Sequence, residues 1–576
     1  MCGIFALLNN DPVFKMEFIK QQFMKGQGRG PEFSKLQKYG FLCLLGFHRL
    51  AINGLNDLSN QPIIIGDVAL ICNGEIYNYK ELYEMMGITP VTQSDCEVII
   101  HLYKRYGMKQ TLQMLDGVFS FVLVDNSIHL LNSKMYIARD PYGVRPLYVL
   151  KPGPENKKGI YGYASELKML SEFYKDLPNC AVEQFRPGTY SKLIMEFKVS
   201  PRWELKKEHC NYHSTGFSSI INESQHDIGF VLKNIQHYLY EAVKKRVLIT
   251  ERPIACLLSG GLDSSLITAL VNECHKKKSN TPLETFSIGL SGSEDLKYAR
   301  IVADYLGTNH TEILLTEDDF VNAIPHVIYA IESYDTTTVR ASIGNYLLGK
   351  YIADNSDAKV IFNGDGSDEL CGGYLYMHAA PDAVEFDKEC RRLLKDIHAF
   401  DVLRSDKCIS SHGLEPRTPF LDRTWVQQYL SIHPSLRFHK GNNQCEKFLL
   451  RSAFSEENYL DSNGSALLPK CVLWRTKEAF SDGVSKTTRS LYEIIQENVA
   501  LCIKADSTIV CKWMESYKHN TPDTDEKKYY RSIFESYYPC LGNVVPYFWM
   551  PRYVNAKDAS ARTLQLYNEV QTDATP

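Results

Sequence analysis

The 576-residue sequence has no long hydrophobic run and no excess of charge of one sign, and its first residues lack the basic start and longer apolar stretch of a secretory signal. No apolar stretch approaches the ~18 residues that a membrane-spanning helix needs, so we expect no membrane segment. The 64 Lys and Arg residues nearly balance the 68 Asp and Glu residues, which makes nucleic acid and anionic membranes poor candidate partners. We therefore expect a cytosolic protein with reduced thiols.

Cysteine pairs of the metal-binding or redox type are also missing. The chain has 16 cysteines, but no two have the Cys-x-x-Cys spacing of a zinc or redox site. No internal repeat is present, and the only low-complexity tract is a polar C-terminal tail. A chain of this length exceeds one ordinary hydrophobic core, so roughly two to four domains are expected.

Four segments with different patterns of apolar and turn residues follow one another along the chain. Residues 2–190 contain short β-rich runs such as "VFSFVLVD" separated by turns, which predicts a sheet-rich layered domain with some helices. Residues 191–230 lack this pattern and are typical of a linker. Over residues 231–550 strands and helices alternate and then helices dominate, which indicates βαβ units around a parallel sheet. Residues 551–576 form the predicted tail.

The most specific stretch is "IACLLSGGLDSS", residues 254–265. An apolar strand ends at Leu258 and two glycines follow before a helix begins. Glycine N–H groups and a helix N-terminus can both approach an anion closely. Ser259 and Ser264 add hydroxyl donors, whereas Asp263 would repel a bare phosphate and therefore suggests a bridging Mg²⁺. The stretch predicts a site for nucleotide phosphates.

Two more strand ends should lie beside this loop, because ligands collect at the carboxyl ends of parallel strands. "TFSIGL" places Ile288 where it could contact an adenine ring, and "VIFNGDGSDEL" carries Asp365, Asp368 and Glu369 among glycines. These acids suit Mg²⁺ and an amine-bearing substrate. An acidic surface turn is the alternative interpretation of the second stretch.

Cys2 is the candidate nucleophile of the first half. Removal of Met1 would leave a thiol and a free α-amine on one residue; the thiolate attacks and the α-amine serves as its base. A cysteine that attacks an amide also needs an oxyanion hole. The Asn73 side chain and the adjacent Gly74 backbone N–H could form one.

Binding of a free amino acid needs a guanidinium for its carboxylate and an acid for its ammonium group. Arg49 in "FHRLAI" could supply the first, and Glu75 or Asp95 the second. Each could instead belong to an ordinary ion pair. Further along, "LWRTKEAFSDG" contains Lys477, which could neutralise charge on departing phosphates or lie on the surface.

The segments of the first half resemble the N-terminal-nucleophile glutaminase domain in the order "MCGIFALL", "FHRLAI", "CNGEIYN", "MLDGVFSF" and "RDPYGVRPLY". "LLSGGLDSS" resembles the pyrophosphate loop of the ATP pyrophosphatases. With "YDTTTVRAS", "HGLEPRTPFLD" and "WRTKEAFSDG" added, nearly the whole chain is similar to the glutamine-hydrolysing asparagine synthetases, most closely to the animal type.

This resemblance implies an N-terminal αββα sandwich at 2–190 and a C-terminal α/β ATP pyrophosphatase domain with a parallel sheet at 231–550. The implied reaction releases ammonia from glutamine, forms aspartyl-AMP and pyrophosphate from aspartate and ATP, and aminates the adenylate to asparagine. Ammonia would pass through an internal apolar tunnel. A cytosolic homodimer that uses ATP and Mg²⁺ is expected, with no nucleic acid and no membrane as partner.

The implied site residues fall into four groups. The catalytic group is Cys2, Asn73, Gly74, Asp365 and Lys477. The glutamine-binding group is Arg49, Leu50, Ala51, Ile52, Asn53, Glu75 and Asp95. The ATP-binding group is Leu258, Ser259, Gly260, Gly261, Asp263, Ser264, Ile288, Asn363 and Gly364. The metal-binding group is Asp263 and Asp368.

The chain departs from the family pattern at two places. Asp365 stands where the family has a glutamate that is linked to the aspartyl-adenylate, and its side chain is one methylene shorter. The family's His-Arg-Gly-Pro-Asp is here Gly-Arg-Gly-Pro-Glu at residues 28–32, which changes the predicted rim of the glutamine pocket.

Three other functions compete with this interpretation. A β-lactam synthetase shares the two-domain plan but has no use for a glutaminase nucleophile, so Cys2 with Asn73 argues against it. An amidotransferase that acts on phosphoribosyl pyrophosphate would lack "SGGLDSS". A sensor or scaffold that binds glutamine or ATP without turnover is favoured only by Asp365.

Overall fold

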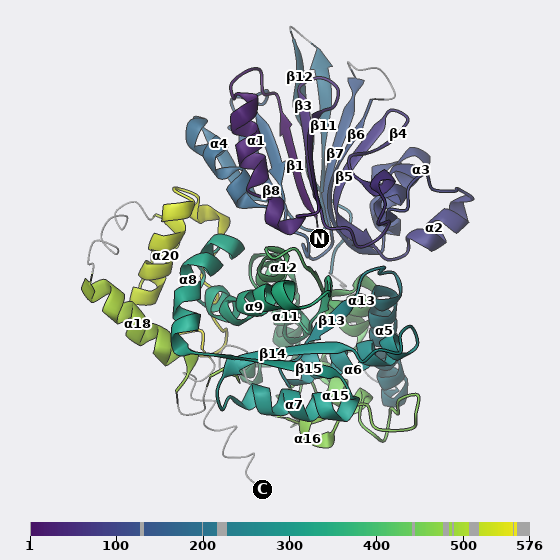
Figure 1. Ribbon diagram of the computed structural model, residues 1–576, viewed down its shortest axis with the longest axis vertical. Coiled ribbons are helices and arrows are strands. Elements are labelled where there is room, and N and C mark those ends of the chain that lie inside the picture. Colours follow the sequence, from purple (N-terminus) through teal and green to yellow (C-terminus); the bar gives the residue numbers. More distant parts are fainter. Residues whose placement is uncertain are drawn as a thin grey trace.

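The computed structural model of the chain contains two domains, with the N-terminal domain above the C-terminal domain in Figure 1. Within the described residues, no helix is long and apolar enough to cross a membrane. The described residues are 2–126, 132–197, 200–215, 227–440, 444–475, 483–485, 489–505, 518–556 and 558–560.

The N-terminal domain contains two six-stranded sheets whose strand pairs are antiparallel. The first sheet consists, in spatial order, of β10 (Cys180–Gln184), β8 (Tyr148–Pro152), β9 (Tyr161–Ala164), β1 (Gly3–Leu8), β3 (Cys43–Arg49) and β2 (Phe33–Lys38). The second consists of β12 (Pro201–Asn211), β11 (Thr189–Phe197), β7 (Lys134–Arg139), β6 (Gly117–Asp125), β5 (Val68–Ile76) and β4 (Ile63–Ile65).

Strand β1 is buried on both faces, so its apolar run is continuous and does not alternate with polar residues. Ile4 and Leu8 pack into the core between the two sheets. Phe5 and Leu7 point to the opposite face and pack in the cluster that includes α1 (Met16–Met24). Because successive side chains point to opposite faces of a strand, a strand buried on both sides needs apolar residues at every position.

Helices cover the outer faces of both sheets (Figure 1). The first sheet is covered by α1 and α4 (Ser171–Asp176), and the second by α2 (Tyr79–Met86) and α3 (Val98–Met114). The side chains of α3 share one cluster with apolar residues of β5 and β6. This order of layers confirms the predicted αββα sandwich.

The predicted linker is wrong at its start. Residues 191–211 contain most of β11 and all of β12, which lie at the edge of the second sheet. The charged run "KKEHCN" conceals this strand, because an edge strand with one face in water tolerates Lys and Glu. Trp203 still anchors β12 in the core between the sheets. Much of the remaining linker, residues 216–226, lies outside the described residues.

The C-terminal domain is built on a five-stranded sheet whose strand pairs are all parallel. Its strands are, in spatial order, β15 (Asn309–Leu315), β14 (Glu284–Leu290), β13 (Ile254–Leu257), β16 (Val360–Phe362) and β17 (Glu415–Arg417). Its helices used below are α5 (Ile228–Leu248), α6 (Leu262–Lys276), α7 (Glu294–Leu306), α9 (Thr336–Asn355), α12 (Asp401–Ser410) and α15 (Phe448–Ala453).

The chain order around β13 determines where a ligand can bind. From β13 the chain adds β14 and β15 on one side, and it later places β16 and β17 on the other. Such a reversal leaves a crevice at the carboxyl ends of the central strands. The parallel sheet is therefore confirmed, and its switch point lies at the predicted phosphate loop.

The first part of the predicted tail is docked on the C-terminal domain. The Asp558 carboxylate accepts a hydrogen bond from Arg340 of α9 at 2.8 Å. The Tyr553 hydroxyl donates to the backbone carbonyl of Glu385 at 3.0 Å. Residues 561–576 lie outside the described residues.

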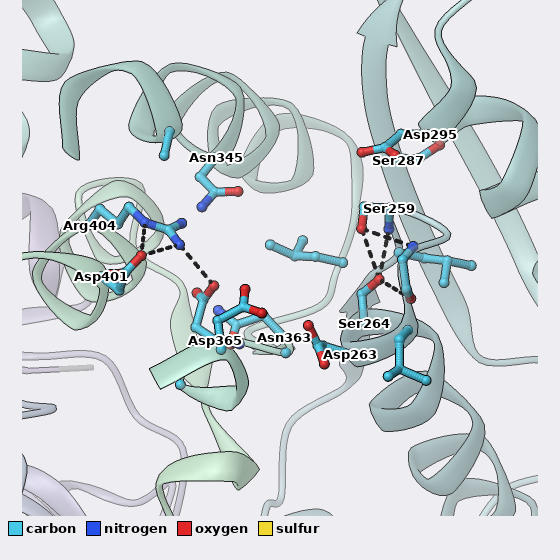
Figure 2. A pocket seen from close by; sticks show the side chains of 18 of the residues that line it. Ser259, Asp263, Ser264, Ser287, Asp295, Asn345, Asn363, Asp365, Asp401 and Arg404 are labelled. Carbon is cyan, nitrogen blue, oxygen red and sulfur yellow. Dashed lines mark hydrogen bonds and ion pairs between the residues drawn. The ribbon is translucent and has the colours of Figure 1, made fainter. Parts of the chain in front are cut away.

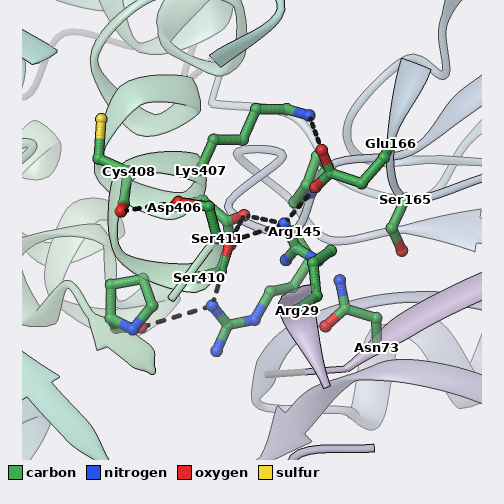
Figure 3. A network of polar contacts seen from close by, with 12 residues as sticks. Arg29, Asn73, Arg145, Ser165, Glu166, Asp406, Lys407, Cys408, Ser410 and Ser411 are labelled. Carbon is green, nitrogen blue, oxygen red and sulfur yellow. Dashed lines mark hydrogen bonds and ion pairs between the residues drawn. The ribbon is translucent and has the colours of Figure 1, made fainter. Parts of the chain in front are cut away.

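A buried network of charges joins the two domains (Figure 3). The Arg29 guanidinium of the N-terminal domain lies 2.7 Å from Glu166 of the same domain and 2.7 Å from Asp406 of α12. Lys407, also on α12, returns to Glu166 at 2.9 Å. Arg145 donates to the second Asp406 oxygen at 3.4 Å. All of these side chains are buried, so each charge is stable only because an opposite charge lies beside it.

We expect Asp406→Ala to lower the free energy of unfolding by about 3 kcal/mol, because it leaves buried guanidinium groups without a compensating charge. Urea denaturation followed by tryptophan fluorescence measures this loss. Asp304→Ala is the matched control, since that carboxylate on α7 is 68 % exposed. Equal losses in the two variants would contradict the importance of the buried network.

Candidate functional site

The predicted phosphate loop adopts a tight turn between β13 and α6 (Figure 2). Gly260 has a φ of +72°, and a Cβ there would lie 2.4 Å from the backbone nitrogen of Ala299, so only glycine fits. Ser264 accepts a hydrogen bond from the Ser259 N–H at 3.2 Å. Their two hydroxyl oxygens are 2.9 Å apart, which ties the loop to the first helical turn.

A pocket opens at the carboxyl ends of β13, β14 and β16. Gly260 shapes the loop without lining the pocket. The other sequence-predicted residues that line it are Leu258, Ser259, Gly261, Asp263, Ser264, Ile288, Asn363, Gly364, Asp365 and Asp368. Three segments that are distant in the sequence thus form one cavity, as the switch-point rule predicts.

Lys447 holds together the two acids predicted to bind a metal. Its ammonium group lies 2.6 Å from Asp263 and 2.5 Å from Asp368. Burial alone would lower the pKa of Lys447, but the two carboxylates raise it, so the side chain is a cation at neutral pH. This end of the pocket therefore has two carboxylates converging on one positive charge.

Asp365 lies at the other end of the pocket, facing Arg404 of α12 (Figure 2). Its Oδ1 is 3.4 Å from an Arg404 nitrogen, whereas its buried Oδ2 has no hydrogen-bond partner among the described residues. Burial raises the pKa of Asp365, and Arg404 opposes that rise. Arg404 makes a closer contact of 2.7 Å with Asp401.

Two further side chains complete this polar end. The Tyr374 hydroxyl donates to Glu369 at 2.5 Å and lies 3.3 Å from Asp401. Burial raises the pKa of Glu369 well above its usual range, and the Asp401 charge raises it further. The Glu369 carboxyl group therefore holds a proton more readily than an exposed glutamate does.

A second site surrounds Cys2 at the start of β1. The Cys2 backbone nitrogen donates to Asn73 Oδ1 at 3.2 Å, and its Sγ lies 3.7 Å from the Leu50 carbonyl oxygen. The Asn73 Nδ2 is buried and has no hydrogen-bond partner among the described residues. This unused donor beside the thiol is what an oxyanion hole requires. Burial raises the pKa of the Cys2 thiol to about 11, so its proton must be removed by a base.

The strand that carries Asn73 also carries Glu75, and its last residue bonds to Asp95, the second predicted glutamine-binding acid. A Cβ on Gly74 would lie 2.5 Å from the Val118 carbonyl oxygen, so the strand approaches β6 too closely for a side chain. Glu75 accepts a hydrogen bond from Asn53 at 2.7 Å. Asp95 accepts one from the Ile76 N–H at 2.7 Å. Burial raises the pKa of Asp95 to about 6.

Arg49 stabilises the neighbouring loop, and its guanidinium group pairs with no acid among the described residues. Its Nη1 donates to the Asn56 carbonyl oxygen at 2.9 Å and to Asn60 Oδ1 at 2.8 Å, and its Nη2 donates to the Gly54 carbonyl oxygen. Residues 50–53 follow directly and run past Cys2. The Asn53 Oδ1 is buried without a partner in the described part of the chain.

Comparison with known proteins matches both halves of the chain. The family model described as "Glutamine amidotransferase domain" matches residues 1–194, and the one described as "Asparagine synthase" matches residues 234–385 and 378–510. The asparagine synthetases [glutamine-hydrolyzing] of Gallus gallus and Homo sapiens are 42 % and 40 % identical, over 98 % of this chain and 99 % of each relative. The chain belongs to the family of glutamine-hydrolysing asparagine synthetases.

Membership of this synthetase family confirms the predicted resemblance and both predicted domain types. It also removes the phosphoribosyl pyrophosphate amidotransferase alternative, because the second half matches asparagine synthase. A solved NH3-dependent NAD synthetase of Campylobacter jejuni is 21 % identical over 25 % of this chain and 60 % of that chain, with a TM-score of only 0.18.

Several residues of the synthetase pocket follow no local sequence motif. Lys447 is separated from Asp263 by 184 residues and follows no recognisable motif. Arg404 and Asp401 lie on α12, whose sequence reads as an ordinary amphipathic helix. The three acids of "NGDGSDE" imply that a basic side chain lies nearby. Which residue supplies that side chain depends on the fold. Lys477, which was predicted to be catalytic, lies outside the described residues.

We expect Lys447→Met to reduce asparagine synthesis about 100-fold or more with either glutamine or ammonia, because it removes a fixed charge from the phosphate end of the pocket. Glutamine hydrolysis by the same variant should persist. Lys440→Met is the control, since that side chain is exposed. Parallel assays of asparagine and glutamate measure both activities, and an unchanged synthesis rate would refute the role of Lys447.

Proposed function

We propose that this chain makes asparagine from aspartate, ATP and glutamine by using its two sites in sequence. The first site releases ammonia from glutamine, and the second converts aspartate and ATP into aspartyl-AMP and pyrophosphate. Ammonia then displaces AMP. The observation that carries the proposal is the pairing, in one chain, of an unused amide donor beside Cys2 with a serine–glycine loop at a parallel-sheet switch point.

At the first site, the Cys2 thiolate attacks the side-chain amide carbon of glutamine. Removal of Met1 would free the Cys2 α-amine, which takes the thiol proton and passes it to the departing ammonia. The Asn73 Nδ2 and the Gly74 N–H bind the tetrahedral oxyanion. Water then cleaves the thioester and yields glutamate. The thiol pKa of about 11 supports this need for an adjacent base.

The glutamine-binding residues act on the other end of the substrate. Glu75 and Asp95 accept hydrogen bonds from the substrate ammonium group, and Arg49 orders the loop that faces its carboxylate. Residues Leu50, Ala51, Ile52 and Asn53 form that loop.

At the second site, Ser259, Gly261 and Ser264 bind the ATP phosphates while Ile288 and Leu258 contact the adenine ring. Aspartate binds at the polar end, where Arg404 pairs with its α-carboxylate and the buried acids Asp365 and Glu369 face its ammonium group. Its side-chain carboxylate then attacks the α-phosphorus. Asn363 and Gly364 line the same pocket and complete the ATP-binding group, and Lys477 would stabilise the departing pyrophosphate.

Mg²⁺ would be held by Asp263 and Asp368. Both carboxylates already converge on the Lys447 ammonium group, so their arrangement fits a cation at the phosphate end. When bound, Mg²⁺ would neutralise part of the phosphate charge. The residues that line the pocket orient ATP and exclude water.

Ammonia would cross between the sites through the apolar domain interface. Val118, Tyr142 and Val144 of the first domain belong to one buried cluster with Leu239 and Val243 of α5. An apolar path favours neutral ammonia over ammonium.

We also propose that the protein is cytosolic and forms a homodimer. Light scattering after gel filtration would test the dimer by measuring its molar mass.

We expect Cys2→Ala to abolish glutamine-dependent synthesis while ammonia-dependent synthesis persists, because the variant lacks only the group that releases ammonia. Asparagine formation from each nitrogen source measures the split. Cys540→Ala is a suitable control, since that cysteine is exposed and distant in the chain. Equal loss of both activities would refute the division of labour.

We expect Asp365→Glu to retain or raise the rate of ammonia-dependent synthesis, by up to about 10-fold, since a misplacement of ~1 Å can cost ~100-fold. The longer side chain moves a carboxylate that now has one unused oxygen further into the pocket. Asp365→Asn, which keeps the length but removes the charge, should lower the rate. A collapse of the Asp365→Glu rate would show that the pocket is adapted to aspartate.

A further inference from the structure

A short turn of the C-terminal domain contacts the glutamine-binding loop of the N-terminal domain. This turn, residues 250–252, connects α5 to β13. The Glu251 N–H donates to the Ile52 carbonyl oxygen at 3.2 Å, and the Glu251 carboxylate accepts a hydrogen bond from the Gly54 N–H at 3.3 Å. The other domain therefore holds backbone groups of Ile52, within the glutamine-binding loop, and of Gly54, directly after it.

Glu32 adds a second connection between the same two segments. Its Oε2 accepts a hydrogen bond from the Ala51 N–H at 2.7 Å, and its Oε1 lies 3.1 Å from an Arg252 nitrogen. Glu32 is the residue at which the chain departs from the aspartate of its family pattern. Both oxygens of the carboxylate are used, and the additional methylene lengthens its reach towards both partners.

The turn itself is anchored, so it can act as a rigid support. The Arg252 N–H donates to Thr250 Oγ1 at 3.1 Å. Lys278, just beyond the end of α6, donates to the Thr250 carbonyl oxygen at 2.7 Å. β13 begins at Ile254 and continues directly into the phosphate loop.

The supported loop carries the contacts that matter at the first site. The Leu50 carbonyl oxygen faces the Cys2 sulfur, and Asn53 donates to Glu75. Between these two residues, Ala51 and Ile52 turn their backbone groups to Glu32 and Glu251. A loop held in its binding conformation loses less entropy when the ligand binds, which raises affinity without changing the chemical step.

We propose that the turn at residues 250–252 positions the glutamine-binding loop through Glu32, so that the synthetase domain helps to set the affinity of the glutaminase site. Arg252 and Glu251 are positioning residues here, since neither reaches the reacting atoms. The inference rests on the assignment of residues 49–53 to glutamine binding. It adds to that assignment a specific contribution from the second domain.

The first test is Arg252→Ala in the full-length protein. The Glu32 and Arg252 side chains are 32 % and 24 % exposed, so their ion pair contributes modestly. We expect the KM for glutamine to rise roughly 2- to 5-fold, equivalent to the ~0.4–1 kcal/mol typical of such pairs. The kcat at saturating glutamine and the ammonia-dependent rate should not change.

The second test is a double-mutant cycle with Glu32→Gln. If Arg252 acts through Glu32, Arg252→Ala should have no further effect on the glutamine KM in the Glu32→Gln background. Arg252→Lys should restore part of the affinity. Arg300→Ala is the matched control, because the Arg300–Glu312 pair has a similar contact of 2.7 Å and is partly exposed.

Three outcomes would overturn the inference. They are an unchanged glutamine KM in Arg252→Ala, additive effects in the cycle, or a matching rise in the KM for aspartate in the ammonia reaction, which would indicate general loosening. Failure of the proposed function is distinguishable, because the unsubstituted protein would then release no glutamate from glutamine.

Discussion

The architecture depends on a single buried guanidinium, that of Arg29. Its Nε donates to the Cys2 carbonyl oxygen at 3.0 Å, and its Nη1 contacts Glu166, Asp406 and Ser410. A charge at this depth is tolerated only when every donor has an acceptor. The contact therefore holds the predicted nucleophile, the end of the first sheet and α12 in a single arrangement.

Helix α12 contacts both the glutaminase domain and the nucleotide pocket. Asp406, Lys407 and Ser410 face the glutaminase domain, whereas Arg404 faces Asp365 in the nucleotide pocket. The turn at residues 250–252 makes a second connection, since it supports the glutamine loop and leads through β13 into the phosphate loop. Short, hydrogen-bonded segments of the described chain thus join the two candidate sites.

The synthetase pocket illustrates how charge is concentrated by a parallel sheet. Acids from the ends of β13 and β16 converge because parallel strands end at one edge. Such a cluster is stable only with cations beside it; α12, which precedes β17 in the chain, supplies Arg404, and a segment after β17 supplies Lys447. Burial raises the pKa of Asp365 and Glu369, so both carboxyl groups hold a proton more readily than exposed acids do.

By itself the sequence determined the parallel sheet and the serine–glycine loop, which depend on local periodicity and a compact motif, and its family resemblance predicted the two domain types. It could not reveal that the charged segment before residue 211 is an edge strand, since an edge in water and a linker have similar composition. Only the tertiary structure brought Lys447 between two acids, placed Arg29 against α12 and joined Glu32 to Arg252. These contacts link residues far apart in the chain, and no local pattern encodes which distant side chain will satisfy a buried charge.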